Sequence, residues 1–148
     1  MAPYVRRFIR ASVLWLVVGV SLGLLMATWP RAVLYRPAHM HANLLGFVSM
    51  MIFGVAYHVI PRFTGAPLHS DRLAALHLVL ANAGLAAMVG GFLLRAHLLA
   101  IGTPLLQAGA AVAASGALLF AWNVWRTLDA APAPAPVTIK RTRTLKAS

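Results

Sequence analysis

The sequence has no cysteine and only two acidic residues, Asp71 and Asp129, among its 148 residues. The missing thiols exclude disulfides, iron–sulfur ligation and thiolate metal sites. Histidine is therefore the main candidate metal ligand, with methionine second. Neither acid lies inside a long apolar run, and no nucleophile is paired with a base. Conventional enzyme chemistry therefore finds little support.

Charged residues as a whole are also scarce. Only 10% of the residues are charged and 61% are hydrophobic, whereas soluble domains carry about 25% charged residues. This balance predicts a membrane protein in contact with the lipid bilayer. The formal net charge of +11 does not indicate nucleic-acid binding, because the basic residues gather at the ends of apolar runs. That placement is what the positive-inside rule describes.

Four apolar runs approach the length of about 20 residues that crosses a hydrocarbon core. They cover residues 8–29, 39–61, 73–94 and 104–125. The short links between them predict antiparallel neighbours. We therefore expect an all-α membrane protein, with a four-transmembrane-helix up-down bundle over residues 1–128. The first run is about twice as long as a signal-peptide core, and no clear cleavage site follows it, so we interpret it as a retained span.

Lysine and arginine are distributed unequally between the two ends of this bundle. Ten of the 13 lie in the N-terminal end, the 62–72 link and the C-terminal segment, against three in the opposite links, Arg31, Arg36 and Arg95. This bias predicts a multi-pass protein of the cell inner membrane with both termini cytoplasmic. Residues 129–148 form an Ala/Pro spacer and a basic segment without an apolar face. They predict a disordered cytoplasmic tail, attracted to anionic lipid or to a partner protein.

Small residues recur at helical spacing in three of the runs. Such rows allow close approach of helix backbones in lipid. They predict contacts within the bundle, and a dimer interface is the alternative. The rows are Gly19 and Gly23; Ala83, Ala87 and Gly91; and Gly109, Ala113 and Ala117.

Histidine is the polar residue that stands out in the apolar runs, where it is costly unless it has a partner. His39, His41 and His58 belong to the second run and His77 to the third. A depth count for antiparallel helices places His39 level with His97, and His58 level with His77. At 100° per residue, His39 and His41 point about 160° apart, so they are alternatives for one inward-facing ligand. The sequence favours one site near the outer face, with His58 and His77 as a weaker second site.

The number of side chains that can reach one point decides which metal or cofactor could bind. Zinc or copper needs three or four ligands close together, and the divergence of His39 and His41 argues against that. Haem b needs only one or two axial imidazoles and a slot between helices. Gly46 and Gly54 would leave room for a macrocycle. Haem b is therefore favoured, with a copper or zinc site and the absence of any cofactor as the alternatives.

The second run also resembles a known family. The residues His41-Ala-Asn43-Leu-Leu-Gly-Phe, followed by Phe53-Gly54-Val-Ala-Tyr57-His-Val-Ile-Pro61-Arg62, resemble the second transmembrane helix of the catalytic subunit of haem–copper oxidases and nitric oxide reductases. Gly65-Ala66-Pro67 resembles the loop that follows it in some oxidases. The resemblance implies that His41, near the outer end, is an axial ligand of haem. His39 is the second choice, because its Arg36-Pro37-x-His39 context also fits.

The resemblance covers residues 36–95, and the departures from the family limit what it implies. The family's catalytic subunit has about twelve spans, and the helices that carry its copper ligands and high-spin haem ligand have no counterpart here. Oxygen reduction by this chain alone is therefore not expected. His97 or His77, or a second copy of the chain, would supply the other axial ligand.

Three functions follow from this reading. The first is a haem b protein that transfers electrons or binds a diatomic gas such as NO or O2. The second is a cofactor-free accessory or assembly subunit of a respiratory oxidase or reductase complex. The third and weakest is copper handling through His39-Met40-His41. A homo-oligomer or a larger respiratory complex is the expected assembly.

Overall fold

The computed structural model describes residues 1–132, and within these it is all-helical, without strands. Four helical segments are long and apolar enough to cross a membrane, with mean hydropathy between 1.6 and 2.1. They cover Pro3–Thr28, Pro30–Thr64, Asp71–Arg95 and Leu99–Asp129. The prediction of four spanning helices is thus confirmed at the level of length and composition. The predicted tail falls almost wholly on residues 133–148, outside the described residues.

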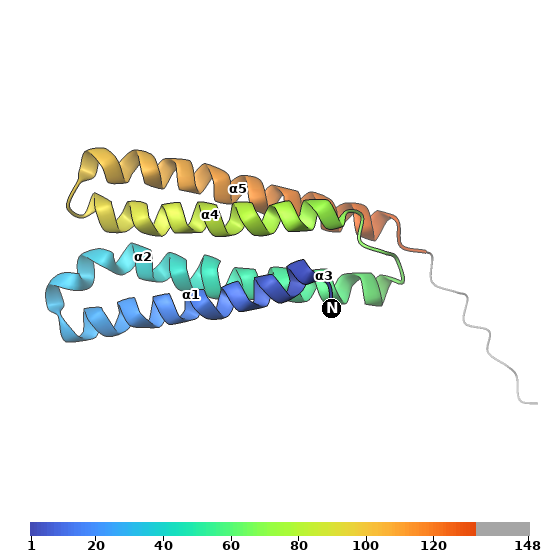
Figure 1. Cartoon of the computed structure of the whole chain (residues 1–148), viewed down its shortest axis with the longest axis horizontal. Coiled ribbons are helices and arrows are strands. Elements are labelled where there is room, and N and C mark those ends of the chain that lie inside the picture. The colour runs from blue at the N-terminus through green and yellow to red at the C-terminus, as the bar shows by residue number, and fades with distance from the viewer. Residues whose placement is uncertain (133–148) are drawn as a thin grey trace, which may run out of the picture.

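The chain reverses direction at each of its three connections (Figure 1). Helix α1 (Pro3–Thr28) runs beside the second segment, and α4 (Asp71–Arg95) runs beside α5 (Leu99–Asp129). The second segment contains a short 3-10 helix, two α-helices and an intervening π-helix. These are η1 (Pro30–Tyr35), α2 (Arg36–His41), η2 (Ala42–Ser49) and α3 (Met50–Thr64).

The second and fourth segments extend beyond the predicted runs of 39–61 and 104–125. The second begins at Pro30, and both η1 and α2 carry a proline in their first turn. Proline is tolerated there because the first-turn N–H groups have no helical acceptor. Residues 30–38, which were expected to be a link, therefore form helical pieces that begin at prolines.

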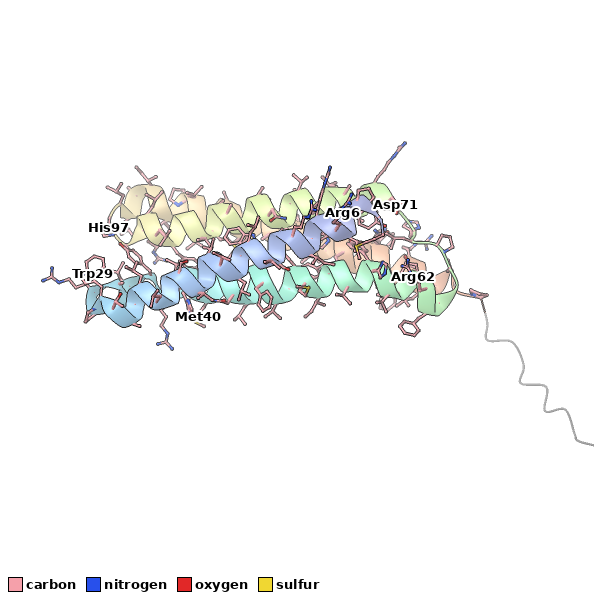
Figure 2. All side chains as sticks on the ribbon, turned by 60° about the horizontal axis from the view of Figure 1, so that its bottom comes forward. Arg6, Trp29, Met40, Arg62, Asp71 and His97 are labelled. Carbon is pink, nitrogen blue, oxygen red and sulfur yellow. The ribbon has the colours of Figure 1, made fainter. Side chains whose placement is uncertain are left out.

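The two ends of the molecule carry different residues. Arg6, Arg62 and Asp71 lie toward one end, and Trp29 and His97 toward the other (Figure 2). The phenol of Tyr4 donates a 2.7 Å hydrogen bond to Asp71 at the first of these ends. This arrangement follows from the antiparallel order of the helices, because the last residues of one helix and the first residues of the next lie at the same end of the bundle.

The connection between α3 and α4 is fastened to α5. Helix α3 ends at Thr64 and is followed by Gly65, whose φ of 68° is the left-handed conformation that glycine adopts readily. The hydroxyl of Ser70 accepts from the Leu73 N–H and caps α4. The amide of Asn123 accepts from the Ser70 N–H at 2.9 Å and donates to the Ser70 carbonyl at 2.8 Å. The His69 N–H donates to the Thr127 hydroxyl at 3.0 Å.

Glycines bring the helices into close contact. On α4, a Cβ at Gly84 would meet the Ala113 backbone, and one at Gly91 would lie 2.6 Å from the Leu106 nitrogen. A Cβ at Gly109 of α5 would lie 2.6 Å from the Met88 nitrogen. The predicted rows on α4 and α5 therefore mark the α4–α5 contact, with two corrections. Ala83 is exposed, and its neighbour Gly84 faces α5 instead; Ala117 is exposed, and its neighbour Gly116 faces Leu80 and Ala81 of α4.

Candidate functional site

His39 packs against α1. Its Nδ1 lies 2.7 Å from the Gly19 carbonyl, and because a carbonyl only accepts, Nδ1 carries the proton. A Cβ at Gly23 would lie 3.0 Å from the ring, and the Asn43 amide donates to the His39 carbonyl at 2.9 Å. The two glycines of α1 thus accommodate His39 and Asn43. This pair joins α1 to the second segment.

His41 faces the opposite way, toward α4. Its Nδ1 lies 2.8 Å from the Pro37 carbonyl and therefore carries the proton, which leaves the lone pair on Nε2. The ring lies 4.8 Å from the Phe92 ring between centroids and is half-buried. The sequence-based expectation that His39 and His41 diverge agrees with this geometry.

A surface groove lies on the same side of the bundle as His41. It has a volume of about 250 Å³ and combines apolar side chains with one guanidinium. The lining residues are Leu34, Pro37, Phe92, Arg95 and Ala96. Pro37 and Phe92 both contact His41 and both line the groove. The imidazole is not itself a lining residue, but it lies next to an apolar groove with a cation in its wall.

His97 is exposed just beyond the end of α4, where its Nε2 lies 2.8 Å from the Tyr35 hydroxyl. The depth count had placed His97 level with His39. Its partner is instead Tyr35, which precedes His39 by about one helical turn. His41 and His97 nevertheless share one end of the bundle. His58 lies toward the other end, where Arg62 donates to its Nδ1 at 3.0 Å. Because Nδ1 accepts, its Nε2 carries the proton.

His77 is fully buried in an aromatic cluster of Phe8, Phe53, Tyr57 and Phe120. The hydroxyl of Tyr57 lies 3.1 Å from its Nδ1, whereas its Nε2 is buried without a hydrogen-bond partner. The depth count had placed His58 level with His77, and the residue that meets His77 is the neighbouring Tyr57. Tyr57 lies on the same helical face as the buried Met50 and Gly54, but the sequence alone does not show that this face is the inward one.

Gly46 and Gly54 contact α1 in the folded chain. A Cβ at Gly46 would lie 2.5 Å from Trp15, and one at Gly54 would lie 3.0 Å from Phe8. The space that was expected to admit a macrocycle is filled by these α1 side chains. Both glycines therefore act as helix contacts.

The π-helix between His41 and Met50 was not predicted. Its hydrogen bonds skip one more residue than those of an α-helix, so the uniform 100° step does not hold across it. The relative directions of His41 and His58 therefore do not follow from 100° per residue. Short π-helical stretches are frequent at functional sites, and this one follows His41 directly.

Two further findings bear on the site. Within residues 1–132, no three histidine or acidic side chains gather in a metal-binding arrangement. A scan of protein-family models and a search of curated proteins gave no match to this chain.

Proposed function

We propose that this chain is an integral membrane protein that binds haem b through His41, in the cell inner membrane, with both termini cytoplasmic. The observation that carries the proposal is the state of the His41 imidazole. Its Nδ1–H is held by the Pro37 carbonyl, which leaves Nε2 unprotonated, and the ring packs against Phe92 in the wall of the groove. A carbonyl behind the ring is the usual device that orients a ligating histidine and keeps Nε2 unprotonated. The resemblance of residues 36–95 to an oxidase helix favours the same residue.

The groove suits the chemistry of haem. Phe92 and Leu34 offer apolar surface to a flat macrocycle, and the guanidinium of Arg95 offers hydrogen bonds to a propionate. Bound haem would supply one-electron transfer with both axial positions filled, or gas binding with one position open. The protein's part is to fix the imidazole, cover one face and neutralise a carboxylate.

The second axial position is more restricted than the sequence suggested. His41 contacts Phe92, which is 15 residues from His77 along α4, or about 22 Å at 1.5 Å per residue. One iron cannot bind both imidazoles across that distance, so His77 is withdrawn as the partner of His41. His97 lies at the correct end, and a second copy of the chain is the alternative source.

The test compares histidine variants after haem-replete expression. The purified wild-type protein should show a Soret band and reduced-state α and β bands, and His41→Ala should lose most of its haem. His69→Ala, which alters an exposed histidine outside the groove, is the matched control and should retain it. His97→Ala should convert a six-coordinate spectrum to a five-coordinate one if His97 completes the site.

Three results would contradict the proposal. Full haem content in His41→Ala would refute the ligand assignment. A haem-free wild-type protein that contains copper would favour copper handling. A haem-free and metal-free protein that purifies with a large oxidase or reductase would favour the accessory-subunit function.

A further inference from the structure

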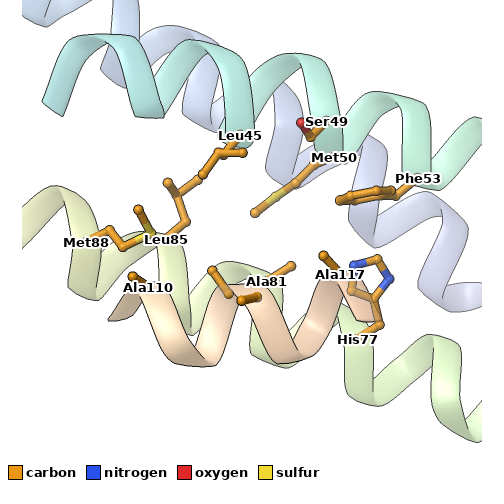
Figure 3. A pocket seen from close by; sticks show the side chains of 12 residues that line it. Leu45, Ser49, Met50, Phe53, His77, Ala81, Leu85, Met88, Ala110 and Ala117 are labelled. Atoms are coloured by element: carbon orange, nitrogen blue, oxygen red, sulfur yellow. The ribbon is translucent and has the colours of Figure 1, made fainter. Parts of the chain in front are cut away.

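A second candidate site lies in the interior of the bundle, about midway along it. A cavity of about 240 Å³ lies between the second segment, α4 and α5. Figure 3 shows His77 at one end of it, with Met50 and Phe53 on one side and Ala81 and Ala117 on the other. Nothing in the proposed haem site uses this cavity.

The polar content of the cavity is concentrated in one atom. His77 is 0% exposed, and its Nε2 has no partner, although a buried polar group without a hydrogen bond is costly. The other polar side chain in the wall, Ser49, already donates its hydroxyl proton to the Leu44 carbonyl at 2.9 Å. The remaining wall is alanine, leucine, methionine and phenylalanine.

This arrangement is unsuited to water. A buried water typically makes about three hydrogen bonds, and the cavity offers at most two polar atoms, His77 Nε2 and the oxygen of Ser49, whose hydroxyl proton is already donated. A cavity of about 150 Å³ is known to hold benzene, so about 240 Å³ fits one ring with a small substituent. The matching ligand is an apolar ring with a single polar atom.

The Tyr57–His77 pair decides which polar atom fits. A phenol is a stronger hydrogen-bond donor than a neutral imidazole, and an imidazole nitrogen is the stronger acceptor. Tyr57 therefore donates to Nδ1 across the 3.1 Å contact, which leaves the proton on Nε2. The ring is neutral, because a charge in an apolar membrane interior is costly. The cavity thus presents a hydrogen-bond donor.

The cavity is reached from the lipid side. Three of its wall residues, Leu45 on η2 and Ala114 and Ala117 on α5, are exposed on the surface of the bundle. They flank the line where the second segment and α5 face each other. A molecule dissolved in the hydrocarbon phase can therefore enter without crossing water.

We propose that this cavity binds a lipid-soluble single-ring compound whose carbonyl oxygen accepts a hydrogen bond from His77 Nε2–H. The probe is 4-fluoroacetophenone, observed by fluorine NMR with the full chain in lipid nanodiscs, and empty nanodiscs give the partition background. Saturable binding above that background is expected. Ethylbenzene, which has nearly the same shape without a carbonyl, should compete about two- to tenfold less well than acetophenone, as the loss of one net hydrogen bond implies.

The variants locate the site. Ala117→Leu fills the cavity beside His77 and should abolish saturable binding, whereas Ala121→Leu, one turn farther along the same exposed surface of α5, should not. His77→Phe should bring acetophenone down to the level of ethylbenzene. If His77→Phe does not fold, the competition series and the alanine pair still decide the matter.

Three outcomes would overturn the proposal. Equal competition by ethylbenzene and acetophenone would show that the carbonyl makes no hydrogen bond with His77 Nε2–H. Tighter binding of phenol than of acetophenone would reverse the donor role assigned to Nε2. A signal that matches empty nanodiscs would mean partition into lipid only. Since haem content is measured separately on the same samples, failure here is distinguishable from failure at His41.

Discussion

The hydroxyl of Tyr57 lies 3.1 Å from Nδ1 of His77, and this contact ties the second segment to α4 inside the bundle. Phe8 and Phe120 pack against the same imidazole at centroid distances of 4.9 and 5.5 Å. Three helices and the second segment therefore converge on one histidine. The neighbouring His58 points to Arg62 instead.

Replacing Tyr57 with phenylalanine should destabilise the bundle by about 1 kcal/mol. The change leaves His77 Nδ1 without a partner, and single hydrogen bonds in membrane bundles average about 0.6 kcal/mol with a maximum near 1.7. Unfolding in mixed detergent micelles measures the loss. Tyr35→Phe, which affects an exposed contact with His97, should change stability by less than about 0.5 kcal/mol. Equal effects of the two changes would refute the importance of the buried pair.

Alanine at Gly91 should weaken the α4–α5 contact by about 1–3 kcal/mol, because its Cβ would lie 2.6 Å from the Leu106 nitrogen and backbone would have to move. Gly90 is the matched control. A Cβ there would meet only Leu105 at 3.8 Å, so Gly90→Ala should be neutral or stabilising by up to about 1 kcal/mol. The same unfolding assay compares them. A larger loss at Gly90 would contradict the packing described.

Asn123→Ala should loosen the connection between α3 and α4. The change removes the partner of both backbone groups of Ser70, at a cost of about 1–3 kcal/mol. Limited proteolysis should then cut residues 65–70 faster. Gln107→Ala, an exposed amide on the same helix, should leave the cleavage rate unchanged. An unchanged rate in Asn123→Ala would show that the two hydrogen bonds do not hold the connection.

Alanine variants of His39 and His41 should show that His39 stabilises the fold and that His41 binds haem. His39→Ala removes the contact with the Gly19 carbonyl, so it should lower stability by about 1 kcal/mol while haem per folded protein stays constant. His41→Ala should give the reverse pattern. Absorbance normalised to the folded fraction separates the two effects. Loss of haem in His39→Ala alone would transfer the ligand assignment to His39.

The absence of native cysteine makes the orientation easy to test. Ala96→Cys and Pro67→Cys place single thiols in exposed connections at opposite ends of the bundle. If both termini are cytoplasmic, a membrane-impermeant maleimide should label Ala96→Cys in intact spheroplasts and leave Pro67→Cys unlabelled until the membrane is opened. The opposite labelling pattern would invert the proposed topology.

Which histidine meets which neighbour was only partly predictable. The depth count identified the level of His77 correctly, because antiparallel helices of known rise fix axial position. It did not choose between Tyr57 and His58, which occupy nearly the same level. The π-helix over residues 42–49 was also not predicted, because it depends on local packing and leaves no periodic pattern in the sequence.

The sequence by itself determined the four apolar helices and their antiparallel order. In a bilayer every backbone polar group must be satisfied within the segment, so a long apolar run has to be helical, and short links have to reverse the chain. Tertiary structure decided the use of the histidines: His39 is joined to α1, His41 keeps a free Nε2 beside a groove, and His77 is buried behind Tyr57. These outcomes depend on which side chains neighbouring helices bring within hydrogen-bond distance, and composition and spacing do not contain that information.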